Sequence, residues 1–144
     1  MSVGTDDVCK INMNINIGDS FSISREVTAE LIEKFAEVSG DFNPIHLDAE
    51  FARQTRFGKQ IAHGMLSGAF ISAILTESMK DLTVVYLSQT MRFTAPVFIG
   101  DTITATGTVR KIREDKKIVS LETICTNQHG DTVVKGEAAI MVLD

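Results

Sequence analysis

Residues 64–79 constrain the fold more strongly than any other part of this 144-residue sequence. The segment has helical spacing, carries small or apolar side chains on nearly all sides, and holds no charge before Glu77. A helix that is apolar all round is buried within a protein. The uncharged stretch around it, residues 61–76, is shorter than the ~20 apolar residues that a membrane span needs. We therefore expect a central, buried helix in a globular chain.

The segments on either side of this helix differ in character. Downstream, residues 83–93, 101–109, 117–126 and 131–142 are β-branched or alternate Thr with apolar residues, and turn-like segments separate them. Such a series predicts an antiparallel sheet. Upstream, we expect an edge strand at residues 20–27, a helix at 28–39 that Thr28 caps and Gly40 ends, and a short helix at 49–54 capped by Asp48.

This order of elements predicts an α+β fold, with one long helix laid against a curled antiparallel sheet. We expect a single domain over residues 1–144, because the sequence contains no linker, repeat or low-complexity segment. Residues 1–10 are predicted to be loosely ordered.

Composition excludes several classes of function. The net charge is −5, from 14 Lys and Arg against 19 Asp and Glu, and no basic run indicates nucleic-acid binding. No basic segment followed by an apolar core marks a secretory signal, so we expect a cytoplasmic protein without membrane attachment. Cys9 and Cys125 lack metal-ligand spacing, and Cys125 is expected to pack as a small hydrophobic residue.

The segment at residues 39–46 carries the most chemical information. Asp41 and His46 lie five positions apart in a predicted loop between two helices, where Gly40 permits an unusual turn and Pro44 stiffens the chain. A carboxylate and an imidazole that reach one water molecule can add that water to an activated double bond. A simpler interpretation is that the Asp binds local backbone amides and that Asn43-Pro44 is turn chemistry. The residues alone leave both interpretations open.

A second candidate lies where the central helix begins, at His63-Gly64-Met65. The first N–H groups of a helix have no intrahelical partner, and Gly64 would let a ligand carbonyl approach them closely. Such an N–H could stabilise the enolate oxygen of a thioester. The alternative is that Gly64 only permits tight helix packing. His63 could form a pocket wall or simply start the helix.

These two segments together resemble the MaoC-like hydratase family. Its signature is Gly or a similar residue, then Asp, any residue, Asn, Pro, an aliphatic residue and His, which matches residues 40–46 (GDFNPIH). The His-Gly-Met of the family matches residues 63–65. Further similar stretches are residues 86–89 (YLSQ), 93–97 (FTAPV), 100–101 (GD) and 136–138 (GEA). The resemblance extends from about residue 21 to the last residue.

The resemblance implies a hot-dog fold, in which the sheet wraps the long helix, and a homodimer with its sites near the interface. The implied reaction is reversible syn hydration of a trans-2-enoyl-CoA to the (R)-3-hydroxyacyl-CoA, without metal or redox cofactor. It implies that Asp41 and His46 activate the water, that Gly64 N–H polarises the thioester carbonyl, and that Asn43 shapes the loop. Ser72 and Leu75 match positions that bound the acyl chain, which we expect to be short to medium. Met65 and His63 are further candidate substrate-binding or loop-shaping residues.

Three rival functions remain. A hot-dog thioesterase often carries a carboxylate on its central helix, but here none precedes Glu77. A 3-hydroxyacyl-[acyl-carrier-protein] dehydratase would use the same pair and a basic surface, for which the densest cluster is Arg110, Lys111, Arg113, Lys116 and Lys117. Such a cluster is also typical of a solvated hairpin tip. A non-catalytic thioester-binding subunit would not need Asp41 and His46.

The product could enter polyhydroxyalkanoate or fatty-acid metabolism.

Overall fold

The computed structural model describes residues 14–79 and 81–143, so the predicted loose start at residues 1–10 lies outside the described part. Its elements follow the chain as β1 (Ser20–Glu26), α1 (Ala29–Ser39), α2 (Pro44–Leu47), α3 (Ala49–Arg53), α4 (Gly64–Ser78), β2 (Thr83–Phe93), β3 (Thr102–Arg113), β4 (Ile118–Thr126) and β5 (Thr132–Leu143). Among these residues, no helix is long and apolar enough to cross a membrane.

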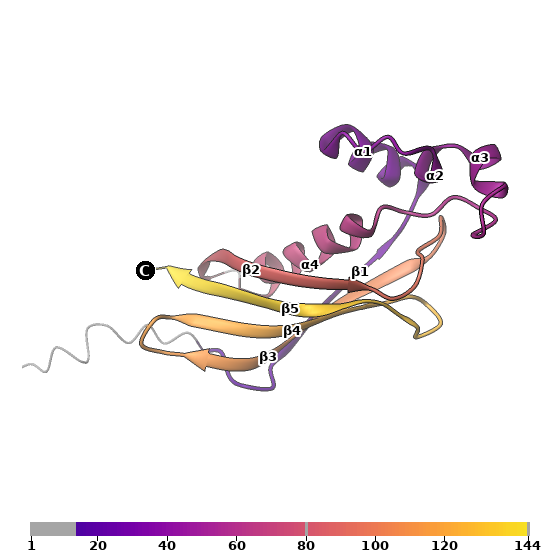
Figure 1. The fold of residues 1–144 in the computed structure, drawn as a ribbon. Coiled ribbons are helices and arrows are strands. Elements are labelled where there is room, and N and C mark those ends of the chain that lie inside the picture. The colour runs from indigo at the N-terminus through magenta and orange to yellow at the C-terminus, as the bar shows by residue number, and fades with distance from the viewer. Residues whose placement is uncertain (1–13, 80, 144) are drawn as a thin grey trace, which may run out of the picture.

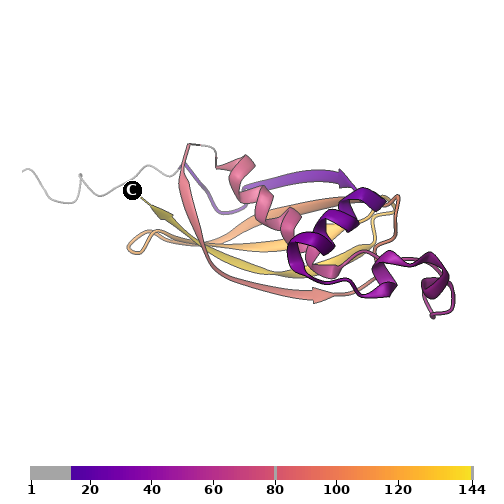
Figure 2. The same ribbon diagram turned by 90° about the horizontal axis from the view of Figure 1, so that it is seen from above.

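The strands form one five-stranded antiparallel sheet in the order β1-β3-β4-β5-β2. Figure 1 shows α4 lying along one face of this curled sheet, and Figure 2 shows α1, α2 and α3 gathered at the end of α4 where that helix begins. The predicted α+β hot-dog architecture is confirmed, with β1 as the expected edge strand. The place of β2 was not predicted: it pairs with β5 at the opposite edge rather than with β3, its neighbour in sequence.

The core forms between α4 and the concave face of the sheet. On α4, the apolar side chains that are buried are Leu66, Phe70, Ile71, Ile74 and Leu75. Alternate residues of β3 and β4 meet them, including Ile103 and Leu121. The prediction of a helix buried on all sides is wrong for the single chain, because Met65, Ala69 and Ser72 form an exposed stripe at helical spacing. The sheet wraps only part of the helix surface.

Two local differences have simple physical reasons. Residues 44–47, expected to be loop, form the helical turn α2, because Asn43 caps it and Pro44 occupies its first turn. Four residues are too few for a periodic pattern to reveal a helix. Strand β3 continues four residues beyond its predicted end at Val109, because a register shift that skips Arg110 lets residues 111–113 pair with β4.

Candidate active site

A relay of side-chain-to-backbone hydrogen bonds shapes the segment that carries Asp41. Ser39 Oγ accepts from Asp41 N at 3.1 Å, Asp41 Oδ1 accepts from Asn43 N at 3.1 Å, and Asn43 Oδ1 accepts from Ile45 N at 3.1 Å. Ser39 in turn donates to the Phe35 carbonyl at 2.6 Å, which joins the relay to α1. Asp41 therefore binds a local amide, as the simpler interpretation expects, but with only one of its two carboxylate oxygens.

His46 lies in α2 with its ring orientation fixed from the opposite side. Its Nδ1–H donates to the Ile61 carbonyl at 2.7 Å, since a carbonyl oxygen can only accept. A neutral ring then carries its lone pair on Nε2. Gln60 Nε2 donates to the His46 carbonyl at 2.8 Å, and Ile61 N donates to the Ile45 carbonyl at 3.2 Å. Residues 60–61 thus position both the backbone and the ring of His46.

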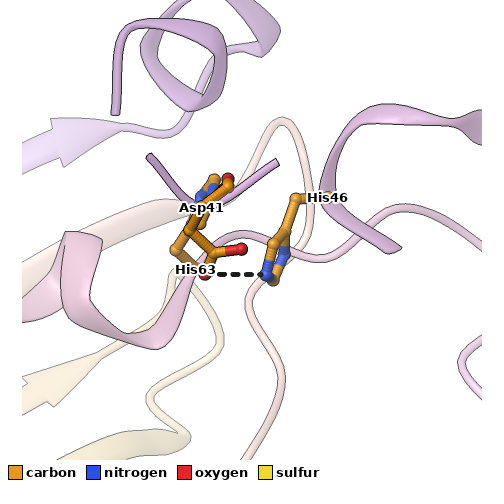
Figure 3. A group of neighbouring side chains, drawn as sticks. All are labelled: Asp41, His46 and His63. Carbon is orange, nitrogen blue, oxygen red and sulfur yellow. Dashed lines mark hydrogen bonds and ion pairs between the residues drawn. The ribbon is translucent and has the colours of Figure 1, made fainter. Parts of the chain in front are cut away.

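Asp41 Oδ2 faces His46 Nε2, and neither atom forms a hydrogen bond with another of the described residues. Asp41 Oδ2 lies 3.9 Å from His46 Nε2, and Figure 3 shows the two groups pointing toward one another. This separation is too long for a hydrogen bond, but one water molecule at about 2.8 Å from each atom would bridge them. The Asp41 side chain is 50% exposed and that of His46 is 11% exposed, so the pair spans the border between solvent and interior.

His63 contacts both members of the pair. Its Nε2–H donates to the Asp41 carbonyl at 2.9 Å, and its ring stacks on that of His46 with centroids 3.9 Å apart. The His63 ring is buried, and Nδ1 has no hydrogen-bond partner within the described residues. Ligand atoms of Asp41, His46 and His63 lie within 4.8 Å of one another, a grouping that could also hold a metal ion. That the site works without a metal remains a prediction.

The amino end of α4 completes this region. His63 is the N-cap and provides no side-chain cap; Leu66 N donates to the His63 carbonyl at 3.0 Å, whereas Gly64 N–H, the first of the helix, has no intrahelical acceptor. A Cβ on Gly64 would come 2.7 Å from Cε1 of Phe93, so the glycine also permits close packing. Both interpretations of Gly64 are therefore compatible with the structure.

A cavity of about 420 Å³ adjoins these groups. Its wall includes His46 and Gly64 from the predicted site, together with Arg56, Phe57, Ile61, Ala62, Ser67, Phe93, Thr94, Ala95, Pro96, Val97, Val133 and Val134. Ser67 and Phe93 were missed as site residues. Ser67 gave no signal as one small polar residue in an apolar helix, whereas Phe93 began one of the stretches that resemble the MaoC-like family.

Other predicted residues lie apart from this cavity. Met65 is 53% exposed and Ser72 is exposed, both on the uncovered stripe of α4. Leu75 is buried in the core cluster that contains Val109 and Ile140. Their proposed contacts with an acyl chain stay predictions. Cys125 is fully buried, as expected, and burial raises the pKa of its thiol to about 12, which makes it unreactive at neutral pH.

Comparison with known proteins gives a consistent assignment. The family model described as MaoC like domain matches residues 14–129. An (R)-specific enoyl-CoA hydratase of Rhodospirillum rubrum is 43% identical over 129 residues, covering 90% of this chain and 89% of that protein. The solved structure of an (R)-hydratase of Aeromonas caviae involved in PHA biosynthesis is similar with a TM-score of 0.86 and 38% identity, covering 90% of this chain and 98% of that one.

A more distant relative carries a different name. The mitochondrial 3-hydroxyacyl-[acyl-carrier-protein] dehydratase of Arabidopsis thaliana is 36% identical, covering 89% of this chain and 78% of that protein. The Aeromonas caviae structure shares the fold class that the helix and curled sheet define. The chain belongs to the MaoC-like domain family.

Proposed function

We propose that this protein is an (R)-specific enoyl-CoA hydratase, which adds water reversibly to trans-2-enoyl-CoA to give (R)-3-hydroxyacyl-CoA. The observation that carries the proposal is the 3.9 Å separation of Asp41 Oδ2 and His46 Nε2 beside a cavity that Gly64 also lines. A carboxylate and an imidazole that hold one water are the groups needed to hydrate an activated double bond. Membership of the MaoC-like family supports the same reaction.

In the proposed complex, the thioester carbonyl lies against Gly64 N–H at the amino end of α4. Negative charge develops on this oxygen as water adds, and the helix dipole and the free N–H stabilise it. One such donor typically contributes about 3 kcal/mol to transition-state stabilisation. Phe93 lies against Gly64, so it would border the reacting end of the substrate.

The Asp41 and His46 pair would hold the water and handle its proton. The water oxygen bonds to C3 of the enoyl group while the π electrons move toward C2 and the thioester oxygen. The proton that leaves the water returns to C2 through the pair, on the same face, which is syn addition. No electrons are gained or lost, so we expect no cofactor beyond the CoA of the substrate. We expect the reaction to take place in the cytoplasm.

His63 and Asn43 would act as positioning residues. Asn43 caps α2, which carries His46, and His63 holds the Asp41 carbonyl while stacking on the His46 ring. Each therefore fixes one or both reacting groups without needing to contact the substrate itself.

We expect a homodimer with its sites near the interface. Strand β2 lies at a sheet edge and exposes Val85 and Leu87, and the uncovered stripe of α4 exposes Met65. Apolar side chains concentrated at an unpaired edge favour association with a second copy. Light scattering should give twice the mass of one chain, and the mass of one chain would contradict this part of the proposal.

The acyl-carrier-protein dehydratase remains the second candidate, because the Arabidopsis thaliana relative bears that name. The predicted basic surface offers it little support. Arg110 pairs with Glu122, and Arg113 pairs with Asp115. The register places this hairpin beside Met141 of β5, whereas the cavity contacts Val134, which lies about 20 Å back along that strand.

The test follows the loss of the conjugated enoyl absorbance of crotonyl-CoA after protein is added. We expect rapid loss with the unmodified protein. Equal amounts of crotonyl-CoA and crotonyl-acyl-carrier protein should then be compared, with a higher kcat/KM expected for the CoA ester. No turnover of either ester would contradict the hydratase, and a strong preference for the carrier protein would favour the second candidate.

A further inference from the structure

One cation lines the cavity and a second lies against a residue next to its wall, and each packs on an aromatic ring. Arg56 lines the cavity, and its guanidinium carbon lies 5.0 Å from the ring centroid of Phe57, another lining residue. Lys59 Nζ lies 4.3 Å from the ring centroid of Phe98, which directly follows Val97 of the cavity wall. Both cations are exposed, so they can meet a ligand group that extends out of the cavity.

The turn that carries these cations is anchored to the candidate active site. Phe57 N donates to Thr55 Oγ1 at 3.3 Å, and Gly58 N donates to the Thr55 carbonyl at 3.0 Å. Gly58 has a φ of 74°, a left-handed conformation that a glycine adopts without strain. The same segment then continues into Gln60 and Ile61, which hold His46 in place. The backbone that carries the two cations and the contacts that hold His46 therefore belong to one short stretch of chain.

The charge environment leaves these two cations available to an anion. Within the described residues, neither Arg56 nor Lys59 forms an ion pair, whereas Arg53, one turn earlier, pairs with Glu50 at 2.9 Å. The chain as a whole carries a net charge of −5, which repels a polyanionic ligand at long range. An acidic protein that binds a phosphate-bearing substrate must therefore supply cations locally. A cation that already pairs with a carboxylate attracts a phosphate less strongly.

We propose that Arg56 and Lys59 bind the phosphate groups at the far end of the pantetheine arm of the thioester substrate. This inference rests on the proposed function, because it assumes that the thioester lies in the cavity beside His46 and Gly64. The arm would leave the cavity past Phe57 and place its phosphate between the two cations. The two cations then determine substrate affinity, while the Asp41 and His46 pair performs the reaction.

The phosphate has two sources, since CoA and the prosthetic group of an acyl carrier protein both carry one on pantetheine. Three crotonyl thioesters separate the contributions: crotonyl-pantetheine without phosphate, crotonyl-phosphopantetheine with one phosphate, and crotonyl-CoA with the added nucleotide phosphates. Kinetics of the unmodified protein and of the Arg56→Gln/Lys59→Gln double variant are measured on all three.

We expect the double variant to raise KM for crotonyl-CoA by about tenfold, the effect of losing two exposed charge pairs, with kcat unchanged. For crotonyl-pantetheine, which lacks the phosphate, KM and kcat should not change. If KM rises equally for crotonyl-phosphopantetheine and crotonyl-CoA, the pantetheine phosphate is the bound group. If KM rises for crotonyl-CoA alone, the two cations bind the nucleotide phosphates instead, which overturns the inference as stated.

Arg53→Gln is the matched control, because it removes a nearby exposed arginine that already has a carboxylate partner. We expect it to leave KM and kcat unchanged for all three substrates. An unchanged KM for crotonyl-CoA in the double variant, or equal losses on crotonyl-CoA and crotonyl-pantetheine, would overturn the inference while leaving the hydratase assignment standing. Absence of turnover by the unmodified protein on every thioester would overturn the proposed function, and this inference with it.

Discussion

The sheet and the segment at residues 40–63 are held together by different forces. In β3 and β4, alternate side chains such as Val109 and Leu121 are buried under α4, and apolar burial maintains the strands. In residues 40–63, few apolar side chains are buried, and hydrogen bonds from side chains to the backbone determine the conformation. The first region provides stability without chemistry. The second provides the candidate chemistry on a scaffold with little core of its own.

This difference indicates which substitutions each region tolerates. Apolar burial is non-directional, so the sheet accepts a changed side chain wherever volume is conserved. A hydrogen-bond relay is directional, so one lost acceptor in residues 40–63 moves the next residue in the chain. We therefore expect activity and stability to respond separately to substitutions in the two regions.

The largest expected effect is on turnover. Asp41→Asn and His46→Gln should each lower kcat for crotonyl-CoA by about 10³-fold, because each removes one proton-transfer group. The Asn amide oxygen can still accept from Asn43 N–H, so the unfolding midpoint should stay near that of the unmodified protein. Steady-state kinetics and thermal unfolding are measured on the same samples.

The controls make the same substitutions in the turns of the sheet. Asp115→Asn and His129→Gln are exposed there and should change neither kcat nor the unfolding midpoint. Near-normal kcat in Asp41→Asn or His46→Gln would remove that residue from the mechanism.

The next effect is on stability and lies in the sheet. A Cβ at position 136 of β5 would overlap the backbone carbonyl of Thr90 in β2 and approach Met91 Cα at 3.1 Å. We expect Gly136→Ala to lower the free energy of unfolding by about 3 kcal/mol, because the two strands must separate. Gly107→Ala is the control, since its Cβ would meet only side chains, at 3.4 Å or more. Similar denaturant midpoints for both variants would show that the close strand approach is not required.

A smaller effect compares two helix caps. Asn43 caps α2, which carries His46, whereas Thr28 caps α1, which carries neither member of the pair. Replacing a cap by Ala costs about 1 kcal/mol. We expect Asn43→Ala to lower kcat/KM about fivefold, the kinetic equivalent of that cost. Thr28→Ala should lower the free energy of unfolding by a similar amount and leave kcat/KM unchanged. If Thr28→Ala lowered kcat/KM and Asn43→Ala did not, α1 rather than α2 would determine the geometry of the catalytic pair.

The smallest expected effect is none at all. Asp41, His46 and His63 could hold a metal ion by their spacing, yet the proposed reaction uses them as proton-transfer and positioning groups. The protein is dialysed against EDTA, and metal analysis confirms that any bound metal has been removed. We expect kcat for crotonyl-CoA to be unchanged after this treatment. Loss of activity that Zn²⁺ restores would contradict the cofactor-free mechanism.

Most of the fold could be predicted from the sequence because local patterns agree with the tertiary structure. Thr28 and Gly40 bound α1 as expected, and alternation predicted the strands to within a few residues. The position of β2 beside β5 could not be predicted, because the order of strands depends on contacts between distant segments. The exposed stripe of α4 was also missed, because composition does not distinguish a face covered by the chain's own sheet from one left open.

The sequence predicted that Asp41 and His46 lie close together, but it did not predict the residues that surround them. The spacing of Asp41 and His46 predicted that they could reach a common point, and the structure places them 3.9 Å apart. It could not reveal that His46 lies in a helical turn, or that its ring bonds to Ile61, fifteen residues away. Arg56 gave no signal either, since an isolated arginine in a turn is usually solvated.

The configuration of the product tests the central claim most directly. If Asp41 and His46 deliver water from one fixed face, crotonyl-CoA should give only (R)-3-hydroxybutyryl-CoA. The product can be hydrolysed and separated on a chiral column against both standards. A single (R) peak that is absent with Asp41→Asn is the predicted result. An (S) product or a racemic mixture would contradict the proposed geometry.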